Sequence, residues 1–212
     1  RPRTGVGGVP PPSRRDLGSP DMELDAVHAA LGGTRFTDVR WVARTGSTNS
    51  DLLEAARAGA PEGVVEVAEE QTAGRGRLDR TWEAPPGSSL LVSILLRPTL
   101  PLAQVHLVST AVGIAASEAC HQVAGVQPLV KWPNDLTVVG GERFEGRKLA
   151  GILAETVLEG DRLGAVVVGL GLNVTWPEQL PPELADIAVA LNHIPGEAVD
   201  RAVLLPALLV RL

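Results

Sequence analysis

The residues most able to do chemistry begin with two lysines in a chain that otherwise uses arginine. Of the nineteen Lys and Arg residues, only Lys131 and Lys148 are lysines. A lysine is a compact point charge whose pKa responds to burial, whereas a guanidinium is a fixed planar fork. Lys131 stands directly before Trp132-Pro133-Asn134-Asp135. Proline favours an extended residue before it, and Asn-Asp is turn-forming, so a strand should end at Lys131 and fix its ammonium at the mouth of a pocket.

The second chemical segment is a glycine- and arginine-rich loop over residues 71–82. Gly74-Arg75-Gly76-Arg77, followed by Arg80, gives a loop of high positive charge density. Glycines allow close approach of the backbone, and arginine forks match phosphate or carboxylate oxygens. No Gly-Lys-Ser/Thr follows, which excludes a Walker loop. A solvated basic turn and a nucleic-acid loop are the alternative interpretations.

Two further segments could contact a ligand. Residues 45–49, Thr-Gly-Ser-Thr-Asn, are small and polar and precede a helix, where free N–H groups are available, although ordinary helix capping explains them too. Thr48 and Asp51 have the spacing of a capping box. Residues 166–174 contain Gly169 and Gly171 inside an apolar strand, which favours close approach of a ligand or of another backbone. A dinucleotide fingerprint is rejected there, because Val174 stands where the third glycine belongs.

Composition limits the class of protein. Hydrophobic residues make up 44% of the 212 residues, enough for a core, and no apolar run approaches a membrane span of about 18 residues. The formal net charge of −6 argues against nucleic acid as a partner. The single cysteine, Cys120, lies among alanines and is interpreted as a packed core thiol. We expect a cytoplasmic protein without membrane association.

The elements that must position these residues alternate short strands with helices. Periodicity and turn residues predict helices over 21–31, from 48 to about 59, over 102–123, 182–191 and 199–212, and strands over 39–43, 64–70, 89–96, 129–131, 136–139, 148–156 and 163–169. Gly160-Asp161 suggests a hairpin between the last two strands. We expect residues 1–20 to be a disordered tail. The predicted fold class is α+β, a mixed and mostly antiparallel sheet with helices packed on it.

Taken together and in this order, the four segments closely resemble the biotin–protein ligase family, monofunctional type. The resemblance rests on Ser47-Thr48-Asn49, Gly74-Arg75-Gly76-Arg77, Lys131-Trp132-Pro133-Asn134-Asp135 and Lys148-Leu149-Ala150-Gly151-Ile152-Leu153, and covers residues 39 to 175. It implies the class-II-synthetase-like fold and a catalytic domain over residues 21–212. It also implies a reaction that joins biotin to the α-phosphate of ATP with Mg²⁺, then transfers biotin to a lysine of a biotin carboxyl carrier protein domain.

The resemblance also implies roles for particular residues. The implied catalytic residues are Lys131, Arg75, Lys148 and Asp135. The implied biotin-binding residues are Ser47, Thr48, Asn49, Gln71, Gly74, Arg75, Gly76, Arg77, Lys131 and Gly151. The implied nucleotide-binding residues are Arg77, Arg80, Trp82, Asn134, Lys148 and Asn173. No metal ligand is assigned, although Asn173 could help to place the metal and phosphates.

The chain also departs from the family's pattern. Such ligases usually carry a small C-terminal β-barrel, which we expect to be absent because the sequence ends in a predicted helix. Residues 1–38 are too short and too rich in Pro and Gly for the helix-turn-helix of bifunctional members, so we expect no repressor role. The sequence leaves open whether the protein forms a homodimer. The rival functions are a lipoate or octanoate ligase or transferase, and a non-catalytic biotin-binding module. The central expectation is that Lys131 and the arginine loop face one cavity.

Overall fold

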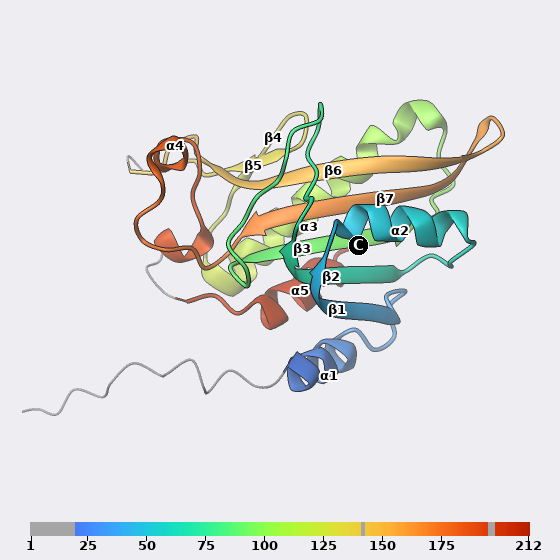
Figure 1. Cartoon of the computed structure of the whole chain (residues 1–212), viewed down its shortest axis with the longest axis horizontal. Coiled ribbons are helices and arrows are strands. Elements are labelled where there is room, and N and C mark those ends of the chain that lie inside the picture. The colour runs from blue at the N-terminus through green and yellow to red at the C-terminus, as the bar shows by residue number, and fades with distance from the viewer. Residues whose placement is uncertain (1–19, 141–142, 195–197) are drawn as a thin grey trace, which may run out of the picture.

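The computed structural model describes residues 20–140, 143–194 and 198–212. The predicted tail over residues 1–20 therefore lies outside the described residues, apart from residue 20, where the first helix begins. Figure 1 shows how the helices and strands are arranged.

One seven-stranded sheet organises the described chain, in the order β1-β2-β3-β7-β6-β5-β4. Strands β1 and β2 are parallel, and every other neighbouring pair is antiparallel. The predicted mixed, mostly antiparallel α+β fold is thereby confirmed. The strands are β1 (Asp38–Thr45), β2 (Val64–Gln71), β3 (Ser89–Leu96), β4 (Leu129–Lys131), β5 (Asp135–Thr137), β6 (Lys148–Glu159) and β7 (Arg162–Asn173).

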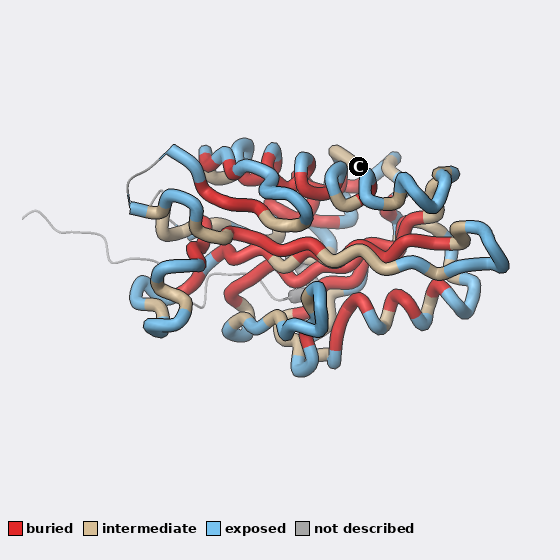
Figure 2. Tube along the Cα trace, turned by 90° about the horizontal axis from the view of Figure 1, so that it is seen from above, coloured by how far each residue is buried: buried red, intermediate tan, exposed pale blue. Residues whose placement is uncertain are grey.

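Helices cover both faces of this sheet. Helix α2 (Thr48–Arg57) packs one face through Leu52 and Leu53, against strand residues such as Val167. Helices α1 (Pro20–Ala30), α3 (His106–Ala124) and α5 (Arg201–Leu209) contribute to the larger core on the other face (Figure 1). Strand β3 is buried along its whole length, as a continuous apolar run at the centre of a sheet should be. Figure 2 shows the buried stretches running through the strands and along the inward sides of the helices.

The hairpin between β6 and β7 and the core position of Cys120 are confirmed. Glu159 pairs with Arg162 across Gly160, whose φ of 63° suits glycine. Cys120 is fully buried on α3, and burial raises the pKa of its thiol to about 12. A thiol in that state is not a nucleophile at neutral pH.

The predicted helix over 182–191 is wrong. Only Pro182–Ala185 forms a short helix, α4, and Leu191–His193 a 3-10 turn, η2. Between them the backbone runs alongside the start of β6: Lys148 N donates to Ile187 O, and Val189 N donates to Lys148 O. Pairing with a strand edge thus overrides the local helical pattern.

The predicted helix over 102–123 begins later than expected. Residues Leu102–Gln104 form a 3-10 turn, η1, and α3 starts at His106. Leu102, the first residue of the predicted helix, is 50% exposed. Helix α3 therefore packs into the core from Val108 onward, where its buried residues begin.

Candidate active site

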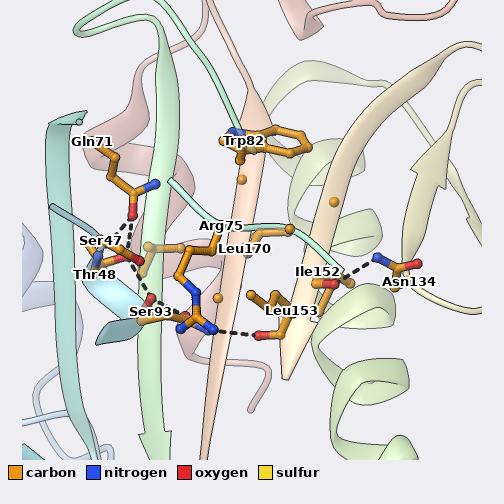
Figure 3. A pocket seen from close by; sticks show the side chains of 16 residues that line it. Ser47, Thr48, Gln71, Arg75, Trp82, Ser93, Asn134, Ile152, Leu153 and Leu170 are labelled. Atoms are coloured by element: carbon orange, nitrogen blue, oxygen red, sulfur yellow. Dashed lines mark hydrogen bonds between the residues drawn. The ribbon is translucent and has the colours of Figure 1, made fainter. Parts of the chain in front are cut away.

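A narrow cavity lies on the sheet beside the first turn of α2, under the arginine loop. Its volume is about 50 Å³. Figure 3 shows Arg75 reaching across it between Ser93 and Leu153, with Trp82 at the other end. The cavity is lined by Ser47, Thr48, Asn49, Gln71, Arg75, Gly76, Trp82, Val92, Ser93, Asn134, Gly151, Ile152, Leu153, Gly169, Leu170 and Gly171.

The start of α2 presents polar groups to this cavity in a way that differs from the predicted capping box. Ser47, not Thr48, is the N-cap residue, and its side chain makes no capping hydrogen bond. The Thr48 backbone N–H donates to Gln71 Oε1 at 2.9 Å. Asp51 instead accepts a hydrogen bond from the Thr45 hydroxyl. The helix N-terminus is thus capped from the neighbouring strand β2, which leaves the Ser47 hydroxyl free of a capping role.

A chain of hydrogen bonds links α2 to the strands under the cavity. The hydroxyls of Thr48 and Ser93 lie 2.7 Å apart, and Ser93 Oγ donates to Asn49 Oδ1 at 2.6 Å. The Asn49 amide Nδ2 then donates to Leu153 O at 3.2 Å and to Glu155 Oε2 at 3.0 Å. Each of Thr48, Asn49 and Ser93 is at most 4% exposed. Such a satisfied buried network fixes the orientation of each polar group in advance of a ligand.

Sequence reasoning missed Ser93 and Glu155. Ser93 is the one polar side chain inside the apolar run of residues 90–96, and a hydroxyl in a fully buried strand signals a specific partner. Glu155 lies seven residues beyond Lys148 on β6, where alternation along the strand puts it on the same face as Gly151 and Leu153. Its place on the same strand face as Gly151 was the feature of the sequence that could have identified Glu155.

Glycines in β6 and β7 make room for side chains from other elements. A Cβ added at Gly171 would lie 2.4 Å from the Trp82 ring, and one at Gly151 would lie 2.7 Å from the same ring. A Cβ at Gly169 would lie 2.3 Å from Asn49 Oδ1. Gly169 and Gly171 were expected to allow close approach of a ligand or of another backbone, and in the structure the side chains of Asn49 and Trp82 lie against them. The indole Nε1–H of Trp82 is buried without a hydrogen-bond partner, so it can donate to a ligand.

Arg75 and Arg77 extend from the loop in two directions. Arg75 forms a two-pronged ion pair with Glu155, with Nη1 at 3.0 Å from Oε2 and Nη2 at 2.8 Å from Oε1. Arg77 Nη1 donates to Asn134 Oδ1 at 3.3 Å. Arg80 is exposed and does not line the cavity, although its backbone bonds to Gly76 and closes the loop. Gly74 is buried behind the lining, where its added Cβ would lie 2.3 Å from Trp82 O.

The two lysines occupy different positions. Lys148 Nζ lies 2.8 Å from Asp135 Oδ1 and 5.2 Å from the centre of the Trp82 ring. It would also lie 3.1 Å from a Cβ on Gly151, so its ammonium is next to the cavity wall. Lys131 ends β4, as predicted, but is exposed and does not line the cavity. Lys131 is therefore not among the residues that this structure places around the cavity, whereas Lys148 lies beside it, and the shared site of Lys131 and the arginine loop stays a prediction.

A second cavity of about 310 Å³ adjoins the first through Trp82. It is lined by Thr81, Trp82, Glu83, Lys148, Asn173, Trp176, Glu183, Leu184, Ile187 and Ala188. Lys148 and Asn173 are thus brought together, as the predicted nucleotide set requires, whereas Arg77 and Asn134 do not line this cavity. An aromatic wall with an adjacent ammonium suits a flat ring that carries phosphates.

Residues beside the second cavity fit a magnesium ion held partly by phosphate. Mg²⁺ commonly takes one or two carboxylates together with substrate phosphates and waters. The Asp135 carboxylate beside Lys148 and the buried Asn173 Oδ1, which has no hydrogen-bond partner, supply oxygen donors of that kind. Across residues 20–140, 143–194 and 198–212, no three acidic, His or Cys side chains form a ready-made metal cage.

The buried Glu66 of β2 interacts with Asp51, a half-buried residue in the first turn of α2. Glu66 is 8% exposed on β2, opposite Ser93 of β3. Burial, reinforced by a hydrogen bond to Asp51 and by that residue's charge, raises the pKa of Glu66 to about 7, and the nearby Arg40 opposes the rise. Protonation of Glu66 near neutral pH therefore affects the helix turn that carries Thr48 and Asn49.

Comparison with known proteins agrees with this geometry. The model of the biotin/lipoate A/B protein ligase family matches residues 41–173. Bifunctional ligase/repressor BirA of Bacillus subtilis is 40% identical over 157 residues, which is 74% of this chain and 46% of that protein. The biotin–[acetyl-CoA-carboxylase] ligase of Mycobacterium tuberculosis is 42% identical over 175 residues, covering 78% of this chain and 61% of that protein. The chain thus spans roughly half to three-fifths of these relatives.

Solved structures lead to the same class. Biotin protein ligase from Aquifex aeolicus, in complex with biotin and ATP, superposes with a TM-score of 0.69 at 31% identity, covering 83% of this chain and 68% of that one. The chain belongs to the biotin/lipoate A/B protein ligase family. Within that family its resemblance to the catalytic domain of biotin–protein ligases is confirmed. No helix in the described part of the chain has the length and apolar character needed to cross a bilayer.

Proposed function

We propose that this chain activates biotin with ATP to biotinyl-5′-AMP and transfers the biotinyl group to a lysine of a biotin carboxyl carrier protein domain. The observation that carries the proposal is the cavity in which the buried Thr48–Ser93–Asn49 network lies directly below the guanidinium of Arg75. Polar groups fixed in an otherwise apolar pocket suit the ureido ring of biotin, and the cation suits its carboxylate.

The first step has to bring a carboxylate to a polyphosphate. At about 4 Å and an effective dielectric of about 20, two unit negative charges repel by about 4 kcal/mol. Arg75 at the first cavity and Lys148 at the second offset this repulsion from both sides of Trp82. The biotin carboxylate oxygen attacks the α-phosphorus, and pyrophosphate leaves. Mg²⁺, held through Asp135, Asn173 and the phosphates, would neutralise phosphate charge during this step.

We assign the remaining residues by position. Ser47, Thr48, Asn49 and Gln71 hold the biotin ring, and Gly151 with Gly171 let the ligand and Trp82 approach the strands. Trp82, Lys148 and Asn173 hold the nucleotide. Arg77, Asn134 and Arg80 close the loop over the mixed anhydride. Lys131 keeps its predicted role only if it moves toward the reactants when they bind.

The arginine loop acts as a lid over residues 72–81. The cavity of about 50 Å³ is far below the roughly 300–1,000 Å³ of ordinary ligand sites, so the lid must move to admit biotin. Leu78 and Asp79 adopt positive φ angles of 57°, and Leu78 is 82% exposed, so the lid tip is held by few contacts. A closed lid excludes water from the reactive adenylate until the carrier lysine attacks.

Transfer completes the cycle in the cytoplasm, where ATP and carrier domains are available. A neutral amine of the carrier lysine attacks the acyl carbon, the bond from that carbon to the phosphate oxygen breaks, and AMP leaves. The proton of the amine passes to the phosphate or to solvent.

ATP–pyrophosphate exchange tests the proposal. The purified chain is incubated with ATP and labelled pyrophosphate, with and without biotin. We expect exchange only when biotin is present. Biotin binding without exchange would instead indicate a non-catalytic biotin-binding module.

A lipoate ligase is the second candidate, because the matching family model includes lipoate ligases. Thermal stabilisation of the chain by biotin and by lipoate, measured at equal concentrations, separates the two. We expect an increase in Tm with biotin and little change with lipoate, and the reverse order would favour the second candidate.

A further inference from the structure

Glu155 holds the lid and the biotin-binding network with one carboxylate. Its Oε2 accepts hydrogen bonds from both Arg75 Nη1 and Asn49 Nδ2, each at 3.0 Å, while Oε1 lies 2.8 Å from Arg75 Nη2. The Glu155 side chain is 21% exposed and that of Arg75 is 46% exposed. A two-pronged arginine–carboxylate pair combines directionality with charge, so it fixes the guanidinium where it lies.

The place where Glu155 fixes Arg75 is the cavity itself. Arg75 crosses the cavity in Figure 3, and only about 50 Å³ is left around it. A ligand with its own carboxylate can displace Glu155 from the guanidinium, because both anions use the same paired N–H groups. A ligand without that charge must break the ion pair and gains no replacement for it.

We propose that Glu155 is a positioning residue that keeps the lid arginine Arg75 inside the cavity and gives it up to the carboxylate of the incoming substrate. The inference rests on the proposed function, since it assumes that the substrate is biotin. Exchange of one carboxylate for another makes lid opening selective for an ionised acid, which is the form that the adenylation step consumes. Asn49 stays linked to Leu153 O during the exchange, so the ring-binding side of the cavity keeps its shape.

The test compares biotin with biotin amide, which lacks the negative charge, in Glu155→Gln. The glutamine keeps the length of the side chain and an oxygen for Asn49, but removes the charge that holds Arg75. Dissociation constants are measured by calorimetry in the whole 212-residue chain. Since both ligands must break the ion pair in the wild-type chain, we expect both dissociation constants to fall by about three- to tenfold in Glu155→Gln, with biotin amide still the weaker ligand.

The matched control is Glu159→Gln, on the same strand and the same face. Glu159 pairs with Arg97 at 3.5 Å with its side chain 70% exposed, and it does not line the cavity. We expect both dissociation constants in this variant to equal those of the wild-type chain. General damage to the fold would weaken the binding of both ligands, which is the opposite of the expected change.

The results separate the role of Glu155 from the proposed function. A dissociation constant of biotin amide that is unchanged or higher in Glu155→Gln, with biotin still bound, overturns the role of Glu155 and leaves the proposed function standing. Failure of the wild-type chain to bind biotin at all overturns the proposed function and this inference with it.

Discussion

Arg75 is the lid residue whose guanidinium reaches furthest into the cavity. Removing its side chain in Arg75→Gly takes away the cation over the acyl phosphate and loosens the lid at the same point. We expect biotinyl-AMP to form and then to escape into solution, because water and ligand exchange are no longer blocked. Free adenylate is measured by chromatography after separation from protein. Retention and transfer equal to those of the wild-type chain would show that Arg75 has no part in closure.

The two lysines give the clearest contrast among single residues. Lys148 lies beside Asp135 and Trp82 at the cavity wall, whereas Lys131 is exposed and outside it. We expect Lys148→Ala to lower the rate of adenylate formation by roughly 100-fold or more, the scale of losing one fixed electrostatic contact to the transition state. Lys131→Ala, predicted from the family resemblance to nearly abolish the reaction, is the direct comparison. Biotin-dependent pyrophosphate release measures both, and a larger loss at Lys131 would reverse the assignment made from geometry.

The residues of the site were predictable from the sequence where they form unusual motifs. The family resemblance, which rests on short motifs, assigned nine of the cavity-lining positions, among them Asn49, Gln71 and Arg75. Glu155 and Ser93 were missed because a glutamate and a serine are common residues, and only their partners across the sheet make them special. The choice between Lys131 and Lys148 depends on which strand edge faces the cavity, which neighbouring residues in the sequence do not reveal.

At the scale of elements, β7 carries glycines where other elements press against it. Gly171→Ala would put a methyl group 2.4 Å from the Trp82 ring, so the indole must move away from β7. We expect nucleotide binding to weaken about tenfold or more while the fold survives, because the ring is only half-buried and can shift. Titration of ATP in the presence of biotin measures the effect.

Gly32→Ala is the control for that substitution, since its added Cβ would meet only Ala29 O, at an ordinary 3.5 Å. The control should bind ATP as the wild-type chain does. Normal ATP binding by Gly171→Ala would mean that Trp82 does not form the nucleotide wall.

The central strands were predictable and the C-terminal segments were not. The run 89–96 is apolar apart from Ser89 and Ser93 and ends before Pro98, so its bounds follow from sequence alone. The segment around Ile187, by contrast, takes its conformation from backbone pairing with Lys148, which lies about forty residues away along the chain. Local periodicity cannot report a partner at that distance, and it therefore predicted a helix.

At the scale of the whole molecule, the Glu66–Asp51 pair makes stability depend on pH. The pKa of Glu66 in the fold is about 7, above its ordinary value of 4.5, so the fold prefers the protonated acid. The contribution of Glu66 to the free energy of unfolding is therefore fully present below about pH 4.5 and is lost as the pH rises through 7. Glu66→Gln keeps a donor toward Asp51 and has no charge to bury. We expect this variant to be more stable than the wild-type chain at pH 8, by on the order of 1–2 kcal/mol, and nearly equal to it at pH 4.5.

Thermal unfolding at both pH values measures the difference. Glu54→Gln, at an exposed position on α2, serves as the control and should follow the wild-type curve. A constant difference between Glu66→Gln and the wild-type chain across this range would show that Glu66 does not titrate with folding.

The burial of Cys120 has a practical consequence for spectroscopy. A thiol that is fully buried, with a pKa near 12, reacts slowly with maleimides at neutral pH, and the sequence contains no other cysteine. A cysteine introduced at the exposed position Ala73, in Ala73→Cys, would therefore take up a fluorophore at one defined place. Its emission would then report each opening and closing of the arginine segment in real time, without any change to the native thiol.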